Sequence, residues 1–191
     1  MFKSDFLDVF SRVKWYVPLF IYVPFISYLV YQTAINPNVS ILAGIGLFVA
    51  GVFLWSFMEY FLHRFVFHYH PTSKFGKKLH FMMHGVHHDY PQDSLRLVLP
   101  PAMSLPLAVG FYFLFQAIMG PDMFTSFLAG FVLGYLGYDM FHYATHHANI
   151  KAQWFRKLKK HHMDHHYKDD EHGFGVSSTF WDIVFRSGFK K

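Results

Sequence analysis

The sequence contains no cysteine, and charged residues are scarce at 15% of the chain. The first absence excludes disulfide bonds, thiolate metal sites and cysteine nucleophiles, so redox chemistry gives no information about the compartment. The second is unusual, because soluble domains carry about 25% charged residues. Hydrophobic residues instead make up 53% of the 191 residues and aromatic residues 21%. This balance predicts a membrane protein, and the length predicts a single domain over residues 1–191.

Four apolar stretches are long enough to be membrane helices. They cover about 15–35, 39–62, 97–118 and 123–143, and each approaches the ~20 residues that cross the hydrocarbon core. Pro100, Pro101 and Pro106 predict that the third is kinked or starts late. The short connections at 36–38 and 120–122 predict two helical hairpins.

The basic residues predict the orientation of these helices. All 17 lysine and arginine residues lie in or beside the N-terminal segment, between Arg64 and Arg96, or from Lys151 onward. Neither short connection contains one. Because positively charged loops stay in the cytoplasm, we expect both termini and the long central loop to be cytoplasmic.

The 15 histidines follow the same partition and recur at helical spacings. His63 and His68 form HxxxxH, and His142 and His146 form HxxxH. The motif HxxHH occurs twice, and its members share one face of a helix. Those six residues are His84, His87 and His88, and His162, His165 and His166. Ten imidazoles exceed the coordination sphere of one ion and suit two, whereas a role as interfacial polar anchors or a pH-sensitive surface is the alternative.

Other residues could support these ligands. Carboxylates often accept the second N–H of a ligating imidazole, and Glu59 and Asp139 precede His63 and His142 by about one turn. His80 lies one turn before His84. His161 lies beside the last motif, where the helical angle alone leaves it open as a substitute for His162.

The expected fold is therefore an all-α integral membrane protein, with four transmembrane helices in two hairpins. A cytoplasmic histidine-rich helical cap, residues 63–96 and 144–191, would hold a dimetal site.

Four segments resemble a known family. They are EYFLHRFVFH (59–68), LHFMMHGVHHDYPQDSLRLVLPP (79–101), GYDMFHYATHH (137–147) and KKHHMDHHYKDDEHGFGVSSTFWDIVF (159–185). Together they resemble the fatty acid hydroxylase and sterol desaturase superfamily, over about residues 55–187. The histidine boxes are common to that superfamily, whereas HHDYPQDSLRLVLPP and GFGVSSTFWD are most similar to the fatty acid 2-hydroxylases.

The resemblance implies an enzyme that activates O2 at two metal ions and hydroxylates a C–H bond of a lipid acyl chain, at carbon 2. The ions would be iron in the working enzyme, although zinc is often found in crystals of such proteins. The implied ligands are the same ten histidines, with no separate catalytic side chain. Eukaryotic 2-hydroxylases carry an N-terminal cytochrome b5 domain, and only a short leader precedes the first apolar stretch here. The resemblance thus implies no haem in this chain and a separate electron donor of the cytochrome b5 or ferredoxin type.

Several alternatives remain at the level of the sequence. A sterol or carotenoid hydroxylase or desaturase would share the histidine boxes, and a structural membrane protein with a metal-stabilised cap would share the composition. A metal transporter is disfavoured because the apolar stretches nearly lack ionisable residues. The basic and aromatic segment at 154–160 could anchor to anionic lipid or dock an acidic electron donor, and nucleic acid is not an expected partner. The length resembles bacterial relatives, which predicts the bacterial inner membrane; a eukaryotic chain would belong in the endoplasmic reticulum.

Overall fold

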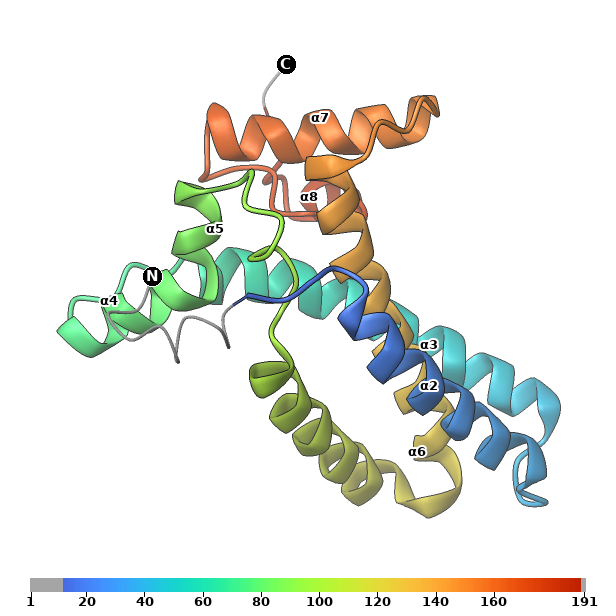
Figure 1. Ribbon diagram of the computed structural model, residues 1–191. Helices are drawn as coiled ribbons and strands as arrows, with labels where there is room; N and C mark the ends of the chain where they lie inside the picture. Colours follow the sequence, from blue (N-terminus) through green and yellow to red (C-terminus); the bar gives the residue numbers. More distant parts are fainter. Residues whose placement is uncertain (1–11, 190–191) are drawn as a thin grey trace. The chain divides into compact units, whose positions relative to one another are not determined.

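The computed structural model describes residues 12–189, in which all regular structure is helical and no strand occurs. Three helices are long (Figure 1): α2 (Val17–Ile35), α3 (Ile41–Phe61) and α6 (Pro101–His147). The shorter elements are η1 (Leu62–Phe67), α4 (Lys74–His80), η2 (Phe81–Gly85), α5 (Val86–Asp89), α7 (Gln153–Tyr167) and α8 (Phe180–Val184). The all-helical fold predicted from the sequence is therefore confirmed for these residues.

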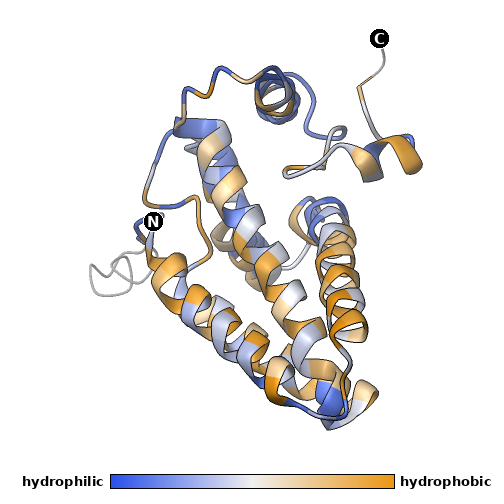
Figure 2. Cartoon of the chain, turned by 90° about the vertical axis from the view of Figure 1, so that its right-hand side faces the viewer, coloured by the Kyte–Doolittle hydropathy of each residue, from blue (hydrophilic) through white to orange (hydrophobic). Residues whose placement is uncertain are grey.

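Three segments are long and apolar enough to cross a membrane. They are Val17–Ile35, Ile41–Phe67 and Pro101–His147, with mean hydropathies of 1.4, 2.2 and 1.7. Figure 2 shows the long helices mainly in the white to orange colours of hydrophobic residues. The first two agree closely with the stretches expected at 15–35 and 39–62.

The third and fourth predicted stretches are two arms of α6. This helix begins at Pro101, where the missing proline N–H costs no helical hydrogen bond, so the late start is confirmed. Gly120 interrupts it with a φ of 77° and a ψ of 169°, and Pro121 follows directly. A left-handed φ is readily available only to glycine. The chain therefore turns at the connection that the sequence marks with glycine and proline.

The described residues form two compact units, and the division falls within α3 after Ser56 and within α6 after Gly137. One unit contains 16–56 and 99–137. In it the two arms of α6 pack through aromatic pairs, including Tyr112 with Phe124 and Phe115 with Phe127, with ring centroids 5.0 Å apart in both. Aromatic edge-to-face contacts of this kind add to the packing free energy.

Helices α3 and α6 approach closely in the same unit. A Cβ atom added to Gly130 would lie 1.9 Å from the Phe48 carbonyl oxygen, and one added to Gly51 would lie 2.0 Å from the Phe127 carbonyl oxygen. Only glycine permits the two backbones to touch here, as small residues do between membrane helices. Asp122 joins the two short connections by accepting a hydrogen bond of 3.0 Å from Asn36 Nδ2.

The other unit contains 12–15, 57–98 and 138–189. It holds the C-terminal ends of α3 and α6, all of the shorter elements and every histidine of the sequence motifs. Its buried apolar side chains include Tyr60, Phe155, Leu158, Phe174 and Val176. The histidine chemistry is thus confined to one compact unit.

Candidate metal centre

Two π-helical turns set the direction of the first histidines. η1 follows α3 directly, and its backbone bond from His68 N to His63 O spans five residues at 3.2 Å. In a π-helix residues i and i+5 are stacked, as i and i+4 are in an α-helix. The five-residue spacing of His63 and His68 is therefore explained by this turn. η2 lies just before His87 and His88 and contains His84.

The ten histidines of the four motifs come together in two groups of five. In each group, one ring nitrogen from every histidine lies within 4.8 Å of those of the other four. The first histidine group is His63, His68, His84, His88 and His165. The second histidine group is His87, His142, His146, His162 and His166. Seven of the ten are buried and the other three are partly buried.

Each HxxHH motif contributes to both groups. His84 and His88, at i and i+4, belong to the first group, while His87 at i+3 belongs to the second. The later motif is divided in the opposite sense, with His162 and His166 in the second group and His165 in the first. The members of a motif share a helical face, as predicted, but that face is divided between two centres.

The distances between ring nitrogens fit a cation within each group. In the first group Nε2 of His63 lies 3.1 Å from that of His84. In the second, Nε2 of His87 lies 2.8 Å from that of His142 and 3.0 Å from that of His166. At this range two neutral imidazoles either share an N–H···N hydrogen bond or turn their lone pairs toward one another, whereas an ion with metal–nitrogen bonds of ~2.1 Å accommodates several neighbouring donors about 3 Å apart. An all-imidazole donor set suits zinc, iron, copper and nickel.

The clustered histidines that lie outside the apolar spans are neutral at pH 7. Burial is the main cause that lowers their pKa values, and neighbouring imidazoles add to it. The pKa falls to about 3 for His68 and His88, and well below its usual range for His84, His87 and His162. A neutral imidazole has a free lone pair, so a metal ion need not displace a proton.

Backbone carbonyls orient two histidines of the first group. His63 Nδ1 lies 2.5 Å from the Phe174 carbonyl oxygen, and His165 Nδ1 lies 2.8 Å from the His172 carbonyl oxygen. Each Nδ1–H donates to its carbonyl, which leaves Nε2 with the lone pair that faces the group. The segment 172–174 therefore fixes the tautomer of His63 and His165.

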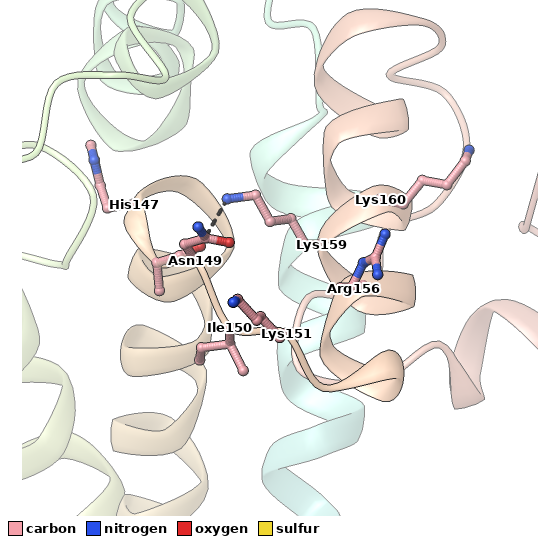
Figure 3. A pocket seen from close by; sticks show the side chains of 8 residues that line it. His147, Asn149, Ile150, Lys151, Arg156, Lys159 and Lys160 are labelled. Carbon is pink, nitrogen blue, oxygen red and sulfur yellow. Dashed lines mark hydrogen bonds between the residues drawn. The ribbon is translucent and has the colours of Figure 1, made fainter.

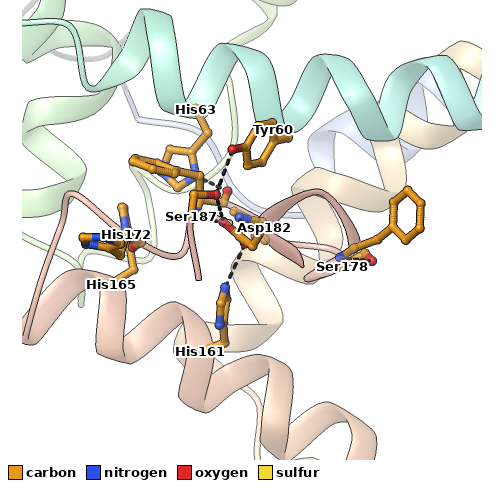
Figure 4. A network of polar contacts seen from close by, with 12 residues as sticks. Tyr60, His63, His161, His165, His172, Ser178, Asp182 and Ser187 are labelled. Carbon is orange, nitrogen blue, oxygen red and sulfur yellow. Dashed lines mark hydrogen bonds and ion pairs between the residues drawn. The ribbon is translucent and has the colours of Figure 1, made fainter. Parts of the chain in front are cut away.

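Two carboxylates hold the loop that follows these carbonyls. Glu59 Oε1 accepts hydrogen bonds from Val176 N at 2.9 Å and Ser177 N at 2.7 Å, and its other oxygen contacts the Ser177 hydroxyl. Asp182 accepts from Phe174 N at 3.0 Å and Gly175 N at 2.8 Å. The polar network around Asp182 is drawn in Figure 4. Sequence reasoning missed Asp182, although the glycines of GFG at 173–175 indicate a tight loop.

The four residues expected to support the ligands lie in different surroundings. Glu59 is buried and bonds to the loop at 176–177, so its effect on His63 passes through the backbone. Asp139 is buried on α6, one turn before His142. His161 lies outside both groups, with Nε2 3.0 Å from Asp182 Oδ2. His80 also lies outside both groups and is partly exposed.

A basic pocket of about 630 Å³ opens beside the second group (Figure 3). Its lining includes His147, Lys151, Arg156, Lys159 and Lys160. Lys159 Nζ donates to the Ala148 carbonyl oxygen at 3.1 Å and lies 3.5 Å from that of His146. The pocket is therefore connected to a histidine of the second group through a hydrogen-bonded lysine.

The fold and the site together define an all-helical protein with apolar spans and paired histidine groups that could hold two metal ions. Residues 48–187 match the fatty acid hydroxylase family. The chain is 37% identical over 184 residues to the Arabidopsis thaliana dihydroceramide fatty acyl 2-hydroxylase FAH1, covering 96% of this chain and 77% of that protein. It is 37% identical over 207 residues to the Homo sapiens fatty acid 2-hydroxylase, covering 98% of this chain and 56% of that protein.

A solved structure is similar over the same length. The visible hydroxylase domain of full-length scs7p matches with a TM-score of 0.91 and 38% identity, over 97% of this chain and 70% of that one. The chain belongs to the fatty acid hydroxylase family.

Proposed function

We propose that this protein is a membrane-bound oxidoreductase that hydroxylates carbon 2 of a fatty acyl chain, with O2 as oxidant and electrons from another protein. The observation that carries the proposal is the pair of histidine groups, each with five ring nitrogens within 4.8 Å. The names of the relatives favour acyl 2-hydroxylation over sterol or carotenoid oxidation, because those named above are hydroxylases of fatty acyl chains.

The ten histidines are the proposed ligands of two metal ions, iron in the working enzyme, with zinc as a substitute. Iron, when bound, supplies the activation of O2 that attack on an unactivated C–H bond requires. In the overall reaction one oxygen atom enters the C–H bond, and the other leaves as water after uptake of two electrons and two protons. The ten imidazoles would hold the ions through ring nitrogens that face each group, and the Nδ1–H groups of His63 and His165 donate to backbone carbonyls.

We propose a single membrane hydroxylase domain whose four spans are α2, α3 and the two arms of α6. The connections at 36–38 and 120–122 contain no lysine or arginine, which supports a position on the non-cytoplasmic side. The segments that carry the histidines would face the cytoplasm, as would both termini, which lie outside the described residues. In the chain, His63 and His142 come at the ends of apolar spans, which suits an acyl substrate whose polar head stays in the interface.

The proposed electron donor is a separate acidic protein of the cytochrome b5 or ferredoxin type. The basic pocket supports this proposal, because Lys159, which lines it together with Lys151, Arg156 and Lys160, reaches the backbone of His146. Opposite charge accelerates encounter between such partners. Binding of anionic lipid is the competing role for these residues.

Lipid mass spectrometry of expressing membranes tests the proposal. Cells that express the native chain should accumulate 2-hydroxy acyl lipids, and cells that express His84→Ala at equal level should not. Absence of O2 or of reductant should abolish the product in isolated membranes. Equal lipid profiles for native and variant chains, with metal bound to the native protein, would indicate a metal-stabilised membrane protein instead.

A further inference from the structure

The two histidine groups differ in how their ligands are supported. In the first group, His63 and His165 donate Nδ1–H to the backbone carbonyls of Phe174 and His172. In the second group, four Nδ1 atoms are buried without a hydrogen-bond partner; they belong to His87, His146, His162 and His166. Acceptors for the outer N–H raise the basicity of a ligating imidazole and fix its ring. The first group therefore has a backbone support that these four ligands do not share.

The backbone support is itself held in place by buried carboxylates. Four consecutive N–H groups, of residues 174–177, point at carboxylate oxygens, two at Asp182 and two at Glu59. Both carboxylates are buried, at 1% exposure for Asp182 and 4% for Glu59. Hydrogen bonds to a carboxylate are among the strong ones in proteins. The loop is thus held by Glu59 at the C-terminal end of α3 and by Asp182 on α8.

Further contacts leave Asp182 little freedom. Its Oδ1 accepts from Ser187 Oγ at 2.8 Å, and its Oδ2 faces His161 Nε2 at 3.0 Å. A Cβ atom added to Gly175 would lie 2.8 Å from Asp182 Oδ2 and 2.1 Å from the Ser178 carbonyl oxygen. The close approach of loop and carboxylate therefore requires glycine at 175.

We propose that Glu59 and Asp182 are positioning residues for the first histidine group alone, acting through the carbonyls of the loop that they fasten. The two metal sites are then unequal, and the affinity of the first depends on this loop while the affinity of the second does not. The inference rests on the proposed function only in taking the two groups as metal sites.

Zinc binding to purified protein in detergent tests this inference, with free zinc set by a metal buffer and bound zinc counted by elemental analysis. Asp182→Asn retains the size of the side chain but turns an N–H donor toward Phe174 N or Gly175 N. We expect zinc affinity to fall ~10–100-fold at one site and to stay within about 2-fold of native at the other. Glu59→Ala should act in the same way.

Glu59→Gln separates hydrogen bonding from charge. Its amide oxygen can still accept from Val176 N and Ser177 N, and its NH2 can donate to the Ser177 hydroxyl, so we expect two zinc ions close to native affinity. Asp164→Asn is the matched control, because Asp164 is a carboxylate on α7 that forms ion pairs with the exposed lysines Lys160 and Lys168. It should also bind two.

Double variants identify which site is lost. The double variants are compared at a free zinc concentration between the native and the weakened affinity of the first site, where Asp182→Asn alone binds one ion. There, Asp182→Asn combined with His84→Ala, a ligand of the first group, should bind one zinc ion, as either change does alone. Asp182→Asn combined with His87→Ala, a ligand of the second group, should bind none. Non-additivity of this kind is the mark of changes that act on one site.

Three results would overturn the proposal. They are native zinc affinity in both Asp182→Asn and Glu59→Ala, loss of both ions in either single variant, and the reverse pattern in the double variants. Each of these leaves the proposed function standing when the native chain binds two ions and forms 2-hydroxy product. A native chain that binds one ion or none would instead refute the proposed dimetal function.

Discussion

Gly130 lies where the backbone of α6 touches that of α3, and alanine there should separate the two helices. The added Cβ would lie 1.9 Å from the Phe48 carbonyl oxygen, whereas ordinary contacts begin at 3.4 Å. Restoring such a contact moves the backbones apart by roughly 1.5 Å, which forfeits much of the dispersion attraction along the helix pair. The three atoms nearest to this Cβ all belong to the backbone of Phe48, so no rotamer change can relieve the clash.

The expected cost is that of overpacking a tight interface, ~1–3 kcal/mol of the free energy of unfolding. For a chain of this size that lowers the melting temperature by ~3–10 °C. Thermal unfolding in detergent, followed by the helical circular dichroism signal, measures it.

Gly110→Ala is the matched control. Gly110 lies on the same helix, and a Cβ there has no neighbour within 4 Å. Alanine has the better helix propensity by up to ~1 kcal/mol, so this variant should be as stable as native or slightly more so. If Gly130→Ala melts at or above the temperature of Gly110→Ala, the close packing of α3 and α6 is refuted.

Three further predictions concern the histidine groups. His87→Ala and His88→Ala, although adjacent in sequence, should each lower metal content by one ion but from different groups, so the double variant should bind neither; a double variant that retains one ion contradicts the division. Asp139→Ala should weaken metal binding or turnover ~10–100-fold while the helices stay inserted, and full metal content with full turnover would show that Asp139 is idle. His162→Ala should abolish 2-hydroxy product, whereas His161→Ala, assayed in parallel, should lose only about a few-fold because it removes a contact to Asp182 and no ligand; the opposite ranking would mean that the register of α7 is wrong.

The sequence was sufficient to select the ten clustered histidines, because these ten recur in motifs of regular spacing. The spacing could not assign them to two groups, because residues on one helical face can contribute to one metal site or to two. The five-residue spacing of His63 and His68 had no explanation until the π-helical turn was seen, and no residue pattern marks such a turn. Regular spacing therefore predicts features within a single helix and no further.

Spacing along the chain could not predict contacts between segments that are distant in the sequence. Glu59 was expected to contact His63, one turn away, yet it binds the backbone of Val176 and Ser177, more than a hundred residues later in the chain. Asp182 was not singled out, because a lone aspartate near a C-terminus has no periodic partner. The apolar stretches expected at 15–35 and 39–62, by contrast, coincide closely with the helices α2 and α3, because length and hydropathy are properties of each segment alone.

The division of each HxxHH motif has a consequence for protein design. Histidines at i, i+3 and i+4 of one short helical segment could supply ligands to two neighbouring ions at once, and the covalent geometry of that segment would restrain how far apart the ions lie. The two HxxHH motifs account for six of the ten clustered histidines, and all six lie outside the apolar spans. A designer of dinuclear catalysts could begin from this pair of HxxHH motifs as a minimal template. The remaining four imidazoles could come from any scaffold that places them around the two ions.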